Sequence, residues 1–253
     1  MVVLLSGKKE HILTLSINRP ERRNALNTEV LSNLIDTFNE IKPGGETKVV
    51  ILRGAGEEPF CAGADIKAMG TAKTGNIIQD TIESVINCPC PVIAMINGYA
   101  IGAGCDLAAA CDIRIIADSA RIGINPVKLG SVYYPISIQR FISIIGAGYT
   151  KELFLTGRFL TAQRAKEIGL VNHVVPVDEL EVTTYLLAQE IAENAPLAVA
   201  WTKSIINRFL NRKLSPEEKA EMQTIMENSW QTEDAREGLA AFIEKRKPIF
   251  RGR

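Results

Sequence analysis

Short, mostly apolar runs alternate with longer amphipathic segments over the first two-thirds of the chain. Runs bounded by Gly, Pro, Asn or Asp are typical of buried strands, and the segments between them have the spacing of helices. Strands that alternate with helices favour parallel pairing through crossover connections, so the pattern predicts an α/β fold. The predicted elements are strands at Ile12–Ile17, Val49–Leu52, Val92–Ile96 and Ile113–Ile116, and helices at Glu29–Ile41, Asn76–Ile86 and Cys105–Ala110.

The last part of the chain has a different, helical pattern. Ser215 and Thr232 each precede Pro or acidic residues, which is typical of the first turn of a capped helix. We therefore predict a core over residues 1–195 and a C-terminal helical region over residues 196–253. The helices expected in the second region are Ala198–Leu210, Ser215–Ser229 and Thr232–Lys245.

The charge balance gives no reason to expect a nucleic acid or an anionic membrane as a partner. Lys and Arg total 29, Asp and Glu total 29, and the formal net charge is 0. Met1–Leu5 is too short for the apolar part of a signal peptide and is expected to be the first strand. No apolar run approaches the roughly 20 residues that span a bilayer. We therefore expect a cytoplasmic protein.

The 5 cysteines do not have the arrangement of a disulfide framework, because their number is odd and they lie in predicted strands, turns and helices. We expect them to be reduced. Cys88 and Cys90 are separated by one proline, which is not the C-x-x-C spacing, and no histidine is near them. They are interpreted as small buried residues, and His11 and His173 as structural residues. No metal, nicotinamide or flavin is expected.

The most informative segment runs from the apolar strand Pro91–Ile96 through a glycine-rich turn into an alanine-rich helix. Gly102, Ala103 and Gly104 carry little or no side chain, so a ligand can approach the main chain where the first amides of a helix are unpaired. Such amides can stabilise an oxyanion. Taken alone, however, a turn of this kind more often binds no ligand.

A second turn of small residues changes that interpretation. It follows the strand Lys48–Arg53 and contains Gly63 and Ala64. If the two strands are neighbours in a sheet, the amide of Ala64 lies near the amide of Ala103, and the two form a two-donor pocket. Two donors directed at one oxygen suit the enolate of a thioester.

Three segments resemble the signatures of the crotonase superfamily, the enoyl-CoA hydratases and isomerases: Phe60-Cys-Ala-Gly-Ala-Asp-Ile66, Asn97-Gly-Tyr-Ala-Ile-Gly-Ala-Gly-Cys-Asp-Leu107 and Cys111-Asp-Ile-Arg114. The resemblance covers nearly the whole chain, with further matches at Asn18–Asn27, Leu155–Arg158, Ala165–Val171 and Phe242–Pro248. It implies a spiral of stacked ββα units with a C-terminal helical region that packs on the core or a neighbouring subunit. It also implies a homotrimer or a dimer of trimers, and no cofactor beyond the coenzyme A of the substrate.

The resemblance assigns the chemistry to a few residues. The amides of Ala64 and Ala103 correspond to the oxyanion donors, and Asp106 falls at the position of the first catalytic glutamate of the hydratases. Asp is one methylene shorter than Glu, so its reach differs. The second glutamate of the hydratases is replaced by Pro126, which cannot transfer a proton. Proton exchange at C2 would then need Tyr133 or a bound water.

The segment Asn125–Tyr133 is similar to bacterial methylmalonyl-CoA decarboxylases, which also have Pro-Val there and a tyrosine at the position of Tyr133. Loss of CO2 generates the thioester enolate directly, so two oxyanion donors and one proton donor can suffice. A histidine in the pocket of those enzymes has no counterpart here, because Ala64 occupies its position. Tyr133 is equally compatible with a partly buried loop aromatic.

The resemblance also implies a set of residues that bind the acyl-CoA. They line the path of the pantetheine and adenine or close the nucleotide end. Outside these motifs, the charged members would more often be solvated surface residues. The predicted set is Arg23, Ala25, Leu26, Ala62, Ala64, Asp65, Ile66, Lys67, Gly102, Phe242 and Lys245.

Hydration or dehydration of an enoyl-CoA is the leading hypothesis, with Asp106 activating or releasing water at C3. Decarboxylation of a malonyl-CoA-type substrate is the alternative, because it explains Pro126 and Tyr133 together, and double-bond isomerisation is the third. A non-catalytic RNA-binding or scaffold protein stays open, because the second acid is missing and the chain end Lys245–Arg253 is basic. The pocket shape is expected to depend on the loops Met69–Asn76 and Ser131–Phe141.

Overall fold

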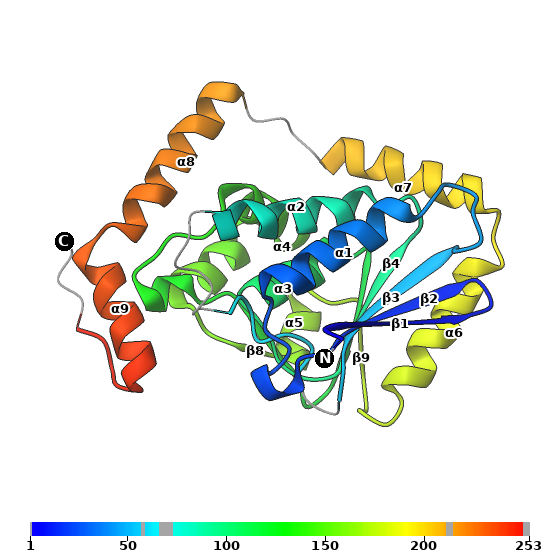
Figure 1. Ribbon diagram of the computed structural model, residues 1–253, viewed down its shortest axis with the longest axis horizontal. Helices are drawn as coiled ribbons and strands as arrows, with labels where there is room; N and C mark the ends of the chain where they lie inside the picture. The colour runs from blue at the N-terminus through cyan, green and yellow to red at the C-terminus, as the bar shows by residue number, and fades with distance from the viewer. Residues whose placement is uncertain (1, 57–58, 66–72, 211–214, 250–253) are drawn as a thin grey trace. The chain divides into compact units, whose positions relative to one another are not determined.

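The computed structural model describes residues 2–56, 59–65, 73–210 and 215–249 (Figure 1). The chain forms two compact units, and each is described by itself. The first consists of Met1–Ile122 and Leu160–Asn211, and the second of Gly123–Phe159 and Arg212–Arg253. The predicted division into a coenzyme-binding core (residues 1–195) and a helical region for subunit packing (residues 196–253) is a division by function, and it stays a prediction.

A six-stranded sheet forms the centre of the first unit, in the order β1-β2-β3-β4-β6-β9. β1 and β2 are antiparallel, and the chain reverses between them through Glu10, which has a φ of 52°. The other neighbouring strands are parallel, as the alternation of strands and helices predicts. The strands are β1 (Leu4–Lys9), β2 (Ile12–Ile17), β3 (Val49–Gly54), β4 (Val92–Ile96), β6 (Ile113–Ala117) and β9 (His173–Val175).

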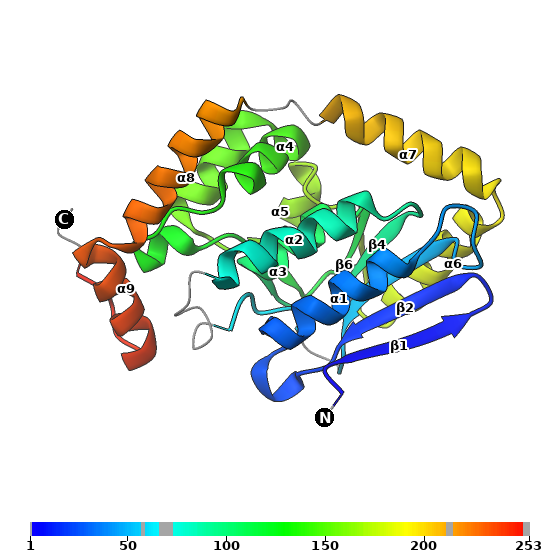
Figure 2. The ribbon, with the colours of Figure 1, turned by 45° about the horizontal axis from the view of Figure 1, so that its top comes forward.

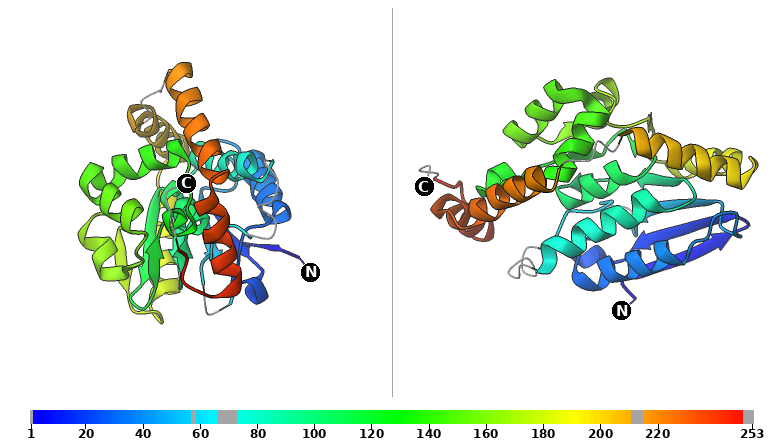
Figure 3. Two further views of the ribbon diagram at one scale, coloured as in Figure 1. Left: turned by 90° about the vertical axis from the view of Figure 1, so that its left-hand side faces the viewer. Right: turned by 90° about the horizontal axis from the view of Figure 1, so that it is seen from above.

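The central strands are buried on both faces. Every residue of β4 is buried, and in β3 only Arg53 is partly exposed. Because alternate residues of a strand point to opposite faces, both sides of the sheet must be covered. α6 (Leu180–Ala192) packs against β2, β3, β4 and β6. α1 (Thr28–Glu40) and α2 (Lys73–Asn87) run side by side on the other side of these strands (Figures 2 and 3).

The first unit has several further elements outside this sheet. They include the helices α3 (Ala103–Ala110), α5 (Ala162–Glu167) and α7 (Pro196–Leu210) and the short 3-10 helix η1 (Pro20–Arg22). A small sheet in the order β5-β7-β8 is formed by β5 (Ala100–Ile101), β7 (Arg121–Gly123) and β8 (Leu160–Thr161).

The second unit is mainly helical. α4 (Pro135–Thr156) contacts α8 (Pro216–Trp230), and α4 is kinked at Gly146, which has a φ of 72° and a ψ of 164°. α9 (Glu233–Glu244) packs against the 3-10 helix η2 (Pro126–Leu129).

Close backbone approach explains why glycines lie where α9 meets η2. A Cβ on Gly238 would lie 2.5 Å from the backbone of Leu129, and a Cβ on Gly130 would lie 2.5 Å from the carbonyl oxygen of Asp234. α9 itself is capped by Thr232, whose hydroxyl accepts a hydrogen bond from the amide of Ala235 at 3.0 Å.

The predicted α/β fold is confirmed, and the strands at Ile12–Ile17 and Val92–Ile96 have the predicted bounds. The first strand was predicted too early, because β1 starts at Leu4 and ends at Lys9, where its pairing with β2 stops. Two helices are not predicted from the sequence: α4, in which Gly146 and Gly148 interrupt the apolar pattern, and α6. Within the described ranges, none of the helices is sufficiently long and apolar to cross a membrane.

Candidate active site

The turn between β4 and α3 adopts a conformation that only small residues allow. Gly102 has a φ of 54° and a ψ of −120°, a combination that favours glycine. α3 begins at the next residue, and the amide of Asp106 donates to the carbonyl of Gly102 at 3.0 Å. The amide of Ala103 therefore lies at the start of the helix, where backbone donors have no partner within the helix.

The turn after β3 is held by an earlier loop. Leu26 and Ala64 form a single parallel bridge. The amide of Leu26 donates to the carbonyl of Gly63 at 2.8 Å, and the carbonyl of Leu26 accepts from the amide of Asp65 at 2.8 Å. These bonds use the backbone groups on either side of Ala64, so the amide of Ala64 itself points away from Leu26.

The two turns lie against each other. The amide of Ile101 donates to the carbonyl of Cys61 at 3.0 Å. A Cβ on Gly63 would lie 2.9 Å from the carbonyl oxygen of Ile101 and 3.7 Å from the nitrogen of Ala103. β3 and β4 are neighbouring strands, as the predicted pocket requires. Among the described residues, neither Ala64 nor Ala103 donates its amide to another group, so two free donors lie in adjacent turns.

Asp106 is an acid inside a helix that is buried along its whole length. Every residue of α3 is buried, and Asp106 is 0% exposed. Residues three apart share one face of a helix, so Asp106 lies on the same face of α3 as Ala103. The start of a helix is a favourable place for a carboxylate, because the helix dipole is positive there. A buried carboxyl group on the helix face of the Ala103 amide can move a proton, or orient a water molecule, beside an oxyanion bound there.

The loop before α1 runs along the turn after β3. The amide of Ala62 donates to the carbonyl of Arg23 at 3.1 Å, while Arg23 is exposed and Leu26 is buried. The structure thus brings Arg23, Ala25 and Leu26 together with Ala62, Ala64 and Asp65. The predicted residues Ile66 and Lys67 lie outside the described residues, as do residues 69–72 of the loop expected to shape the pocket.

Two residues that hold this loop were missed by the sequence argument. Arg19 forms an ion pair with Asp65 at 3.1 Å and donates to the carbonyl of Ala25 at 2.6 Å. Asn24 is 0% exposed, and its amide donates to the carbonyls of Ala55 at 3.0 Å and Pro59 at 2.7 Å. Both lie within the matched motif Asn18–Asn27, but their partners come from a distant part of the sequence.

The predicted site residues of the second unit have their own surroundings. Tyr133 is 8% exposed, and its ring packs edge-on against Tyr134 at a centroid distance of 5.1 Å. Pro126 begins η2. Phe242 is 54% exposed, and Lys245, with a φ of 56°, ends α9. The parts that these residues play in binding or catalysis stay predictions.

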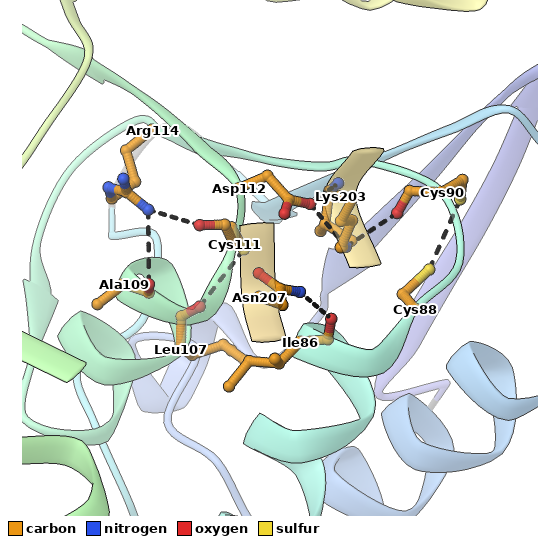
Figure 4. A network of polar contacts seen from close by, with 11 residues as sticks. Ile86, Cys88, Cys90, Leu107, Ala109, Cys111, Asp112, Arg114, Lys203 and Asn207 are labelled. Atoms are coloured by element: carbon orange, nitrogen blue, oxygen red, sulfur yellow. Dashed lines mark hydrogen bonds and ion pairs between the residues drawn. The ribbon is translucent and has the colours of Figure 1, made fainter. Parts of the chain in front are cut away.

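A polar network holds the C-terminal end of α3 (Figure 4). The guanidinium of Arg114 donates to the carbonyl of Cys111 at 2.5 Å and to the carbonyl of Leu170 at 2.8 Å. A cation at this end of a helix complements the helix dipole. Burial lowers the pKa of Arg114. The sequence indicates Arg114 only as part of a motif, whereas the structure gives it a role in fixing α3.

A surface hollow of about 370 Å³ lies elsewhere in the first unit, between β1, β2 and Tyr185 of α6. It contains none of the predicted site residues. In the part of the chain that the structure describes, no group of three or more His, Cys, Asp or Glu residues is arranged to hold a metal ion.

Comparisons of sequence point to one family. The profile described as enoyl-CoA hydratase/isomerase matches residues 7–253. A putative enoyl-CoA hydratase/isomerase of Bacillus subtilis is 41% identical over 99% of this chain and 98% of its own length. The short-chain-enoyl-CoA hydratase of Clostridium acetobutylicum is 38% identical over 95% of this chain and 94% of its own length.

Solved structures are similar over the same extent. A methylmalonyl-CoA decarboxylase in complex with 2-nitronate-propionyl-CoA has a TM-score of 0.92 and 28% identity, covering 100% of this chain and 99% of that chain. An enoyl-CoA hydratase of Bacillus anthracis has a TM-score of 0.78 and 38% identity, covering 100% of both chains. The relatives therefore include proteins named for two different reactions.

Proposed function

Because the chain belongs to the enoyl-CoA hydratase/isomerase family, with its crotonase-type fold, we propose that it converts an acyl-CoA thioester through an enolate. The observation that carries the proposal is the adjacency of two free backbone amides, on Ala64 and Ala103. An enolate places negative charge on the thioester oxygen, and two fixed donors stabilise that charge more than they stabilise the neutral carbonyl. Removing one such donor typically slows a reaction by about 100-fold to 1,000-fold.

Hydration or dehydration of an enoyl-CoA is the reaction we favour. Asp106 would act as the general base that activates water at C3, or as the acid that releases it. Its burial and its place on the helix face of Ala103 support this role. The proton at C2 would come from Tyr133 or from a bound water, since Pro126 has no proton to give. The similarity to the short-chain-enoyl-CoA hydratase supports the same reaction.

Decarboxylation of a malonyl-CoA-type substrate is the second candidate. It is favoured by the likeness to methylmalonyl-CoA decarboxylase, whose TM-score of 0.92 exceeds the 0.78 of the Bacillus anthracis hydratase. Loss of CO2 leaves the electron pair on the enolate, so this reaction needs the two amides and a single proton donor. Tyr133 is the donor we propose for that case.

A further set of residues is proposed to bind the coenzyme A part of the substrate. We propose that Arg23, Ala25 and Leu26 bind the coenzyme A part together with Ala62 and Asp65. The partly exposed small residues Ala25 and Ala62 suit the pantetheine, and the exposed Arg23 suits a phosphate. We further propose Ile66, Lys67, Gly102, Phe242 and Lys245 as contributors, and no cofactor beyond the coenzyme A of the substrate.

An oligomer is proposed from the surface of α7. Four large apolar side chains recur there every four residues, so they form one stripe along the helix. A stripe of this size in water favours burial against another subunit. Leu197 is 43% exposed, Trp201 62%, Ile205 55% and Phe209 86%. A homotrimer or a dimer of trimers is the assembly we propose.

One experiment separates the two reactions. Purified protein is incubated with crotonyl-CoA and, separately, with methylmalonyl-CoA. The masses of the products are then measured by mass spectrometry. Gain of one water supports hydration, and loss of CO2 supports decarboxylation. If the protein neither binds nor alters any acyl-CoA offered, the proposed function is wrong.

The variant Asp106→Asn tests the proposed acid and base. We expect hydration to fall by about 100-fold to 10,000-fold, the usual contribution of a general acid or base, while the Kd for acyl-CoA stays near the wild-type value. Asp118→Asn, which changes an exposed acid of the same unit, is the matched control. Unchanged turnover in Asp106→Asn would remove Asp106 from the mechanism.

A further inference from the structure

Two cysteine sulfurs meet at the junction between α2 and β4, away from the glycine turns. Cys88 follows the last residue of α2, and Cys90 lies two residues before β4. Their Sγ atoms are 3.6 Å apart. The residues are 2% and 7% exposed, so both are buried.

The backbone around the pair is held on both sides. The amide of Cys88 donates to the carbonyl of Val85 at 3.3 Å. The ammonium of Lys203, in α7, donates to the carbonyl of Cys90 at 3.1 Å and forms an ion pair with Asp112 at 2.7 Å (Figure 4). Asp112 in turn accepts a hydrogen bond from the amide of Val92, the first residue of β4. These contacts hold the backbone that carries the two cysteines.

The pKa values of the two thiols are shifted in opposite directions. The two thiols share one hydrogen bond, in which either sulfur can be the donor. With Cys90 as the donor, this bond lowers the pKa of Cys88 and raises the pKa of Cys90. The positive charge of Lys203 lowers the pKa of both thiols, and the carboxylate of Asp112 raises it. With Cys90 as the donor, Cys88 is the more readily ionised of the two thiols, and the thiolate is the form that attacks.

Cys61 and Cys111 have no sulfur partner among the residues that the structure describes. Cys61 accepts a hydrogen bond from the amide of Gly63 at 3.4 Å, and Cys111 donates to the carbonyl of Leu107 at 3.4 Å. Burial raises the pKa of each of these thiols to about 12. They are therefore poorly reactive, and the pair stands apart from them.

We propose that Cys88 and Cys90 form a redox-active dithiol, which a hydroperoxide oxidises to an intramolecular disulfide. The Cys88 thiolate attacks the terminal peroxide oxygen, the O–O bond breaks, and the alcohol or water leaves with a proton. The resulting sulfenic acid is attacked by the Cys90 sulfur, which forms the S–S bond and releases water. In total two thiols lose two electrons and two protons, and the peroxide is reduced to an alcohol and water.

The geometry favours a disulfide over a metal site. A disulfide bond is about 2.05 Å long, so the sulfurs need to approach by roughly 1.5 Å. A structural zinc site needs about four ligands, most often Cys or His. Within the described chain, no third ligand joins the pair to make a metal-binding group.

Peptide mapping after mild oxidation tests the proposal. The native protein is treated with hydrogen peroxide, and the remaining thiols are alkylated. The protein is then digested, and the peptide masses are measured by mass spectrometry. Of the 5 cysteines, 2 should be lost to the alkylating reagent, leaving 3, and the peptide with Cys88 and Cys90 should lose two hydrogen atoms. Dithiothreitol should restore both thiols.

Matched variants keep the test decisive. Cys111→Ala should form the same disulfide, whereas Cys88→Ala and Cys90→Ala should each form none. The proposal is overturned if native Cys88 and Cys90 stay reduced while urea-unfolded protein is oxidised by the same peroxide. It is also overturned if they become sulfinic or sulfonic acids without a disulfide. Neither result bears on the acyl-CoA reaction, because that is measured separately on the reduced protein.

Discussion

The two turns that supply the proposed oxyanion donors are built in different ways. The turn after β4 is local, since Gly102 redirects the chain and the buried helix α3 starts at the next residue. The turn after β3 depends on a distant loop, through the bridge between Leu26 and Ala64 and the contacts of Arg19 and Asn24. One donor is therefore positioned by its own helix, and the other by a scaffold of hydrogen bonds.

This difference indicates where each donor is vulnerable. The helix-borne amide moves only if α3 moves, and α3 is packed on all sides and fixed at its far end by Arg114. The amide of Ala64 moves if its loop contacts are lost, even while the sheet stays intact. A substitution under α3, at Gly104, should thus mainly affect folding, whereas substitutions in the turn after β3 or in the loop behind it should displace the Ala64 amide.

Among the substitutions proposed here, Gly104→Ala should have the largest effect, and it should act on stability. A Cβ at Gly104 would lie 2.8 Å from the Cβ of Cys61 and still closer to its carbonyl oxygen, so α3 would be pushed from the other turn. We expect the free energy of unfolding in urea to fall by about 3 kcal/mol, the upper end of the usual cost of overpacking. Gly148→Ala is the control, because nothing lies within 4 Å of its Cβ. Equal stability of the two variants would contradict close contact between the turns.

Gly63→Ala should mainly affect the rate. Gly63 has a φ of 101°, and its Cβ would lie 2.9 Å from the carbonyl oxygen of Ile101, so the neighbouring amide of Ala64 would be displaced. We expect kcat to fall by about 100-fold with a smaller change in KM, as for loss of one oxyanion donor. The control is Gly7→Ala, where a Cβ meets nothing within 4 Å. A rise in KM at constant kcat would assign Gly63 to substrate binding instead.

Asn24→Ala should have the smallest effect of the three. It leaves the carbonyls of Ala55 and Pro59 without the donor that bonds them, and a lost buried partner costs about 1–3 kcal/mol. We expect roughly 2 kcal/mol less stability in urea unfolding, and a decrease in kcat smaller than that of Gly63→Ala. Arg22→Ala, which changes an exposed residue of the same loop, should match wild type. If it is as damaging as Asn24→Ala, the effect belongs to the loop as a whole.

The same contrast explains how much of the site could be predicted from the sequence. The turn after β4 combines an apolar run, small residues and a helix within a few positions, so local rules are enough to find it. The roles of Arg19 and Asn24 depend on partners that chain folding brings together, and propensity does not encode those partners. The resemblance placed Arg23, Ala25 and Leu26 near the second turn, and the backbone pairing of Leu26 gives the physical reason.

Outside the glycine turns, the sequence predicts which strands and helices exist better than it predicts where they begin and end or what they pack against. β1 extends to Lys9 because it pairs with β2, although its last residues are polar. α4 was missed because Gly146 interrupts its pattern, and tertiary packing overrides that local preference. The cysteine pair shows the same limit, since the C-x-C spacing in the sequence does not show that the two sulfurs converge.

Both proposed donors are main-chain atoms, and this has an evolutionary consequence. Only a substitution by proline removes the amide hydrogen of Ala64 or of Ala103, so the proposed oxyanion donors would survive most point mutations at these two positions. What selection must keep instead is the absence of bulk at Gly63, Gly102 and Gly104. On the proposed function, a lineage could then change its acidic residues and its reaction while these two backbone donors persist.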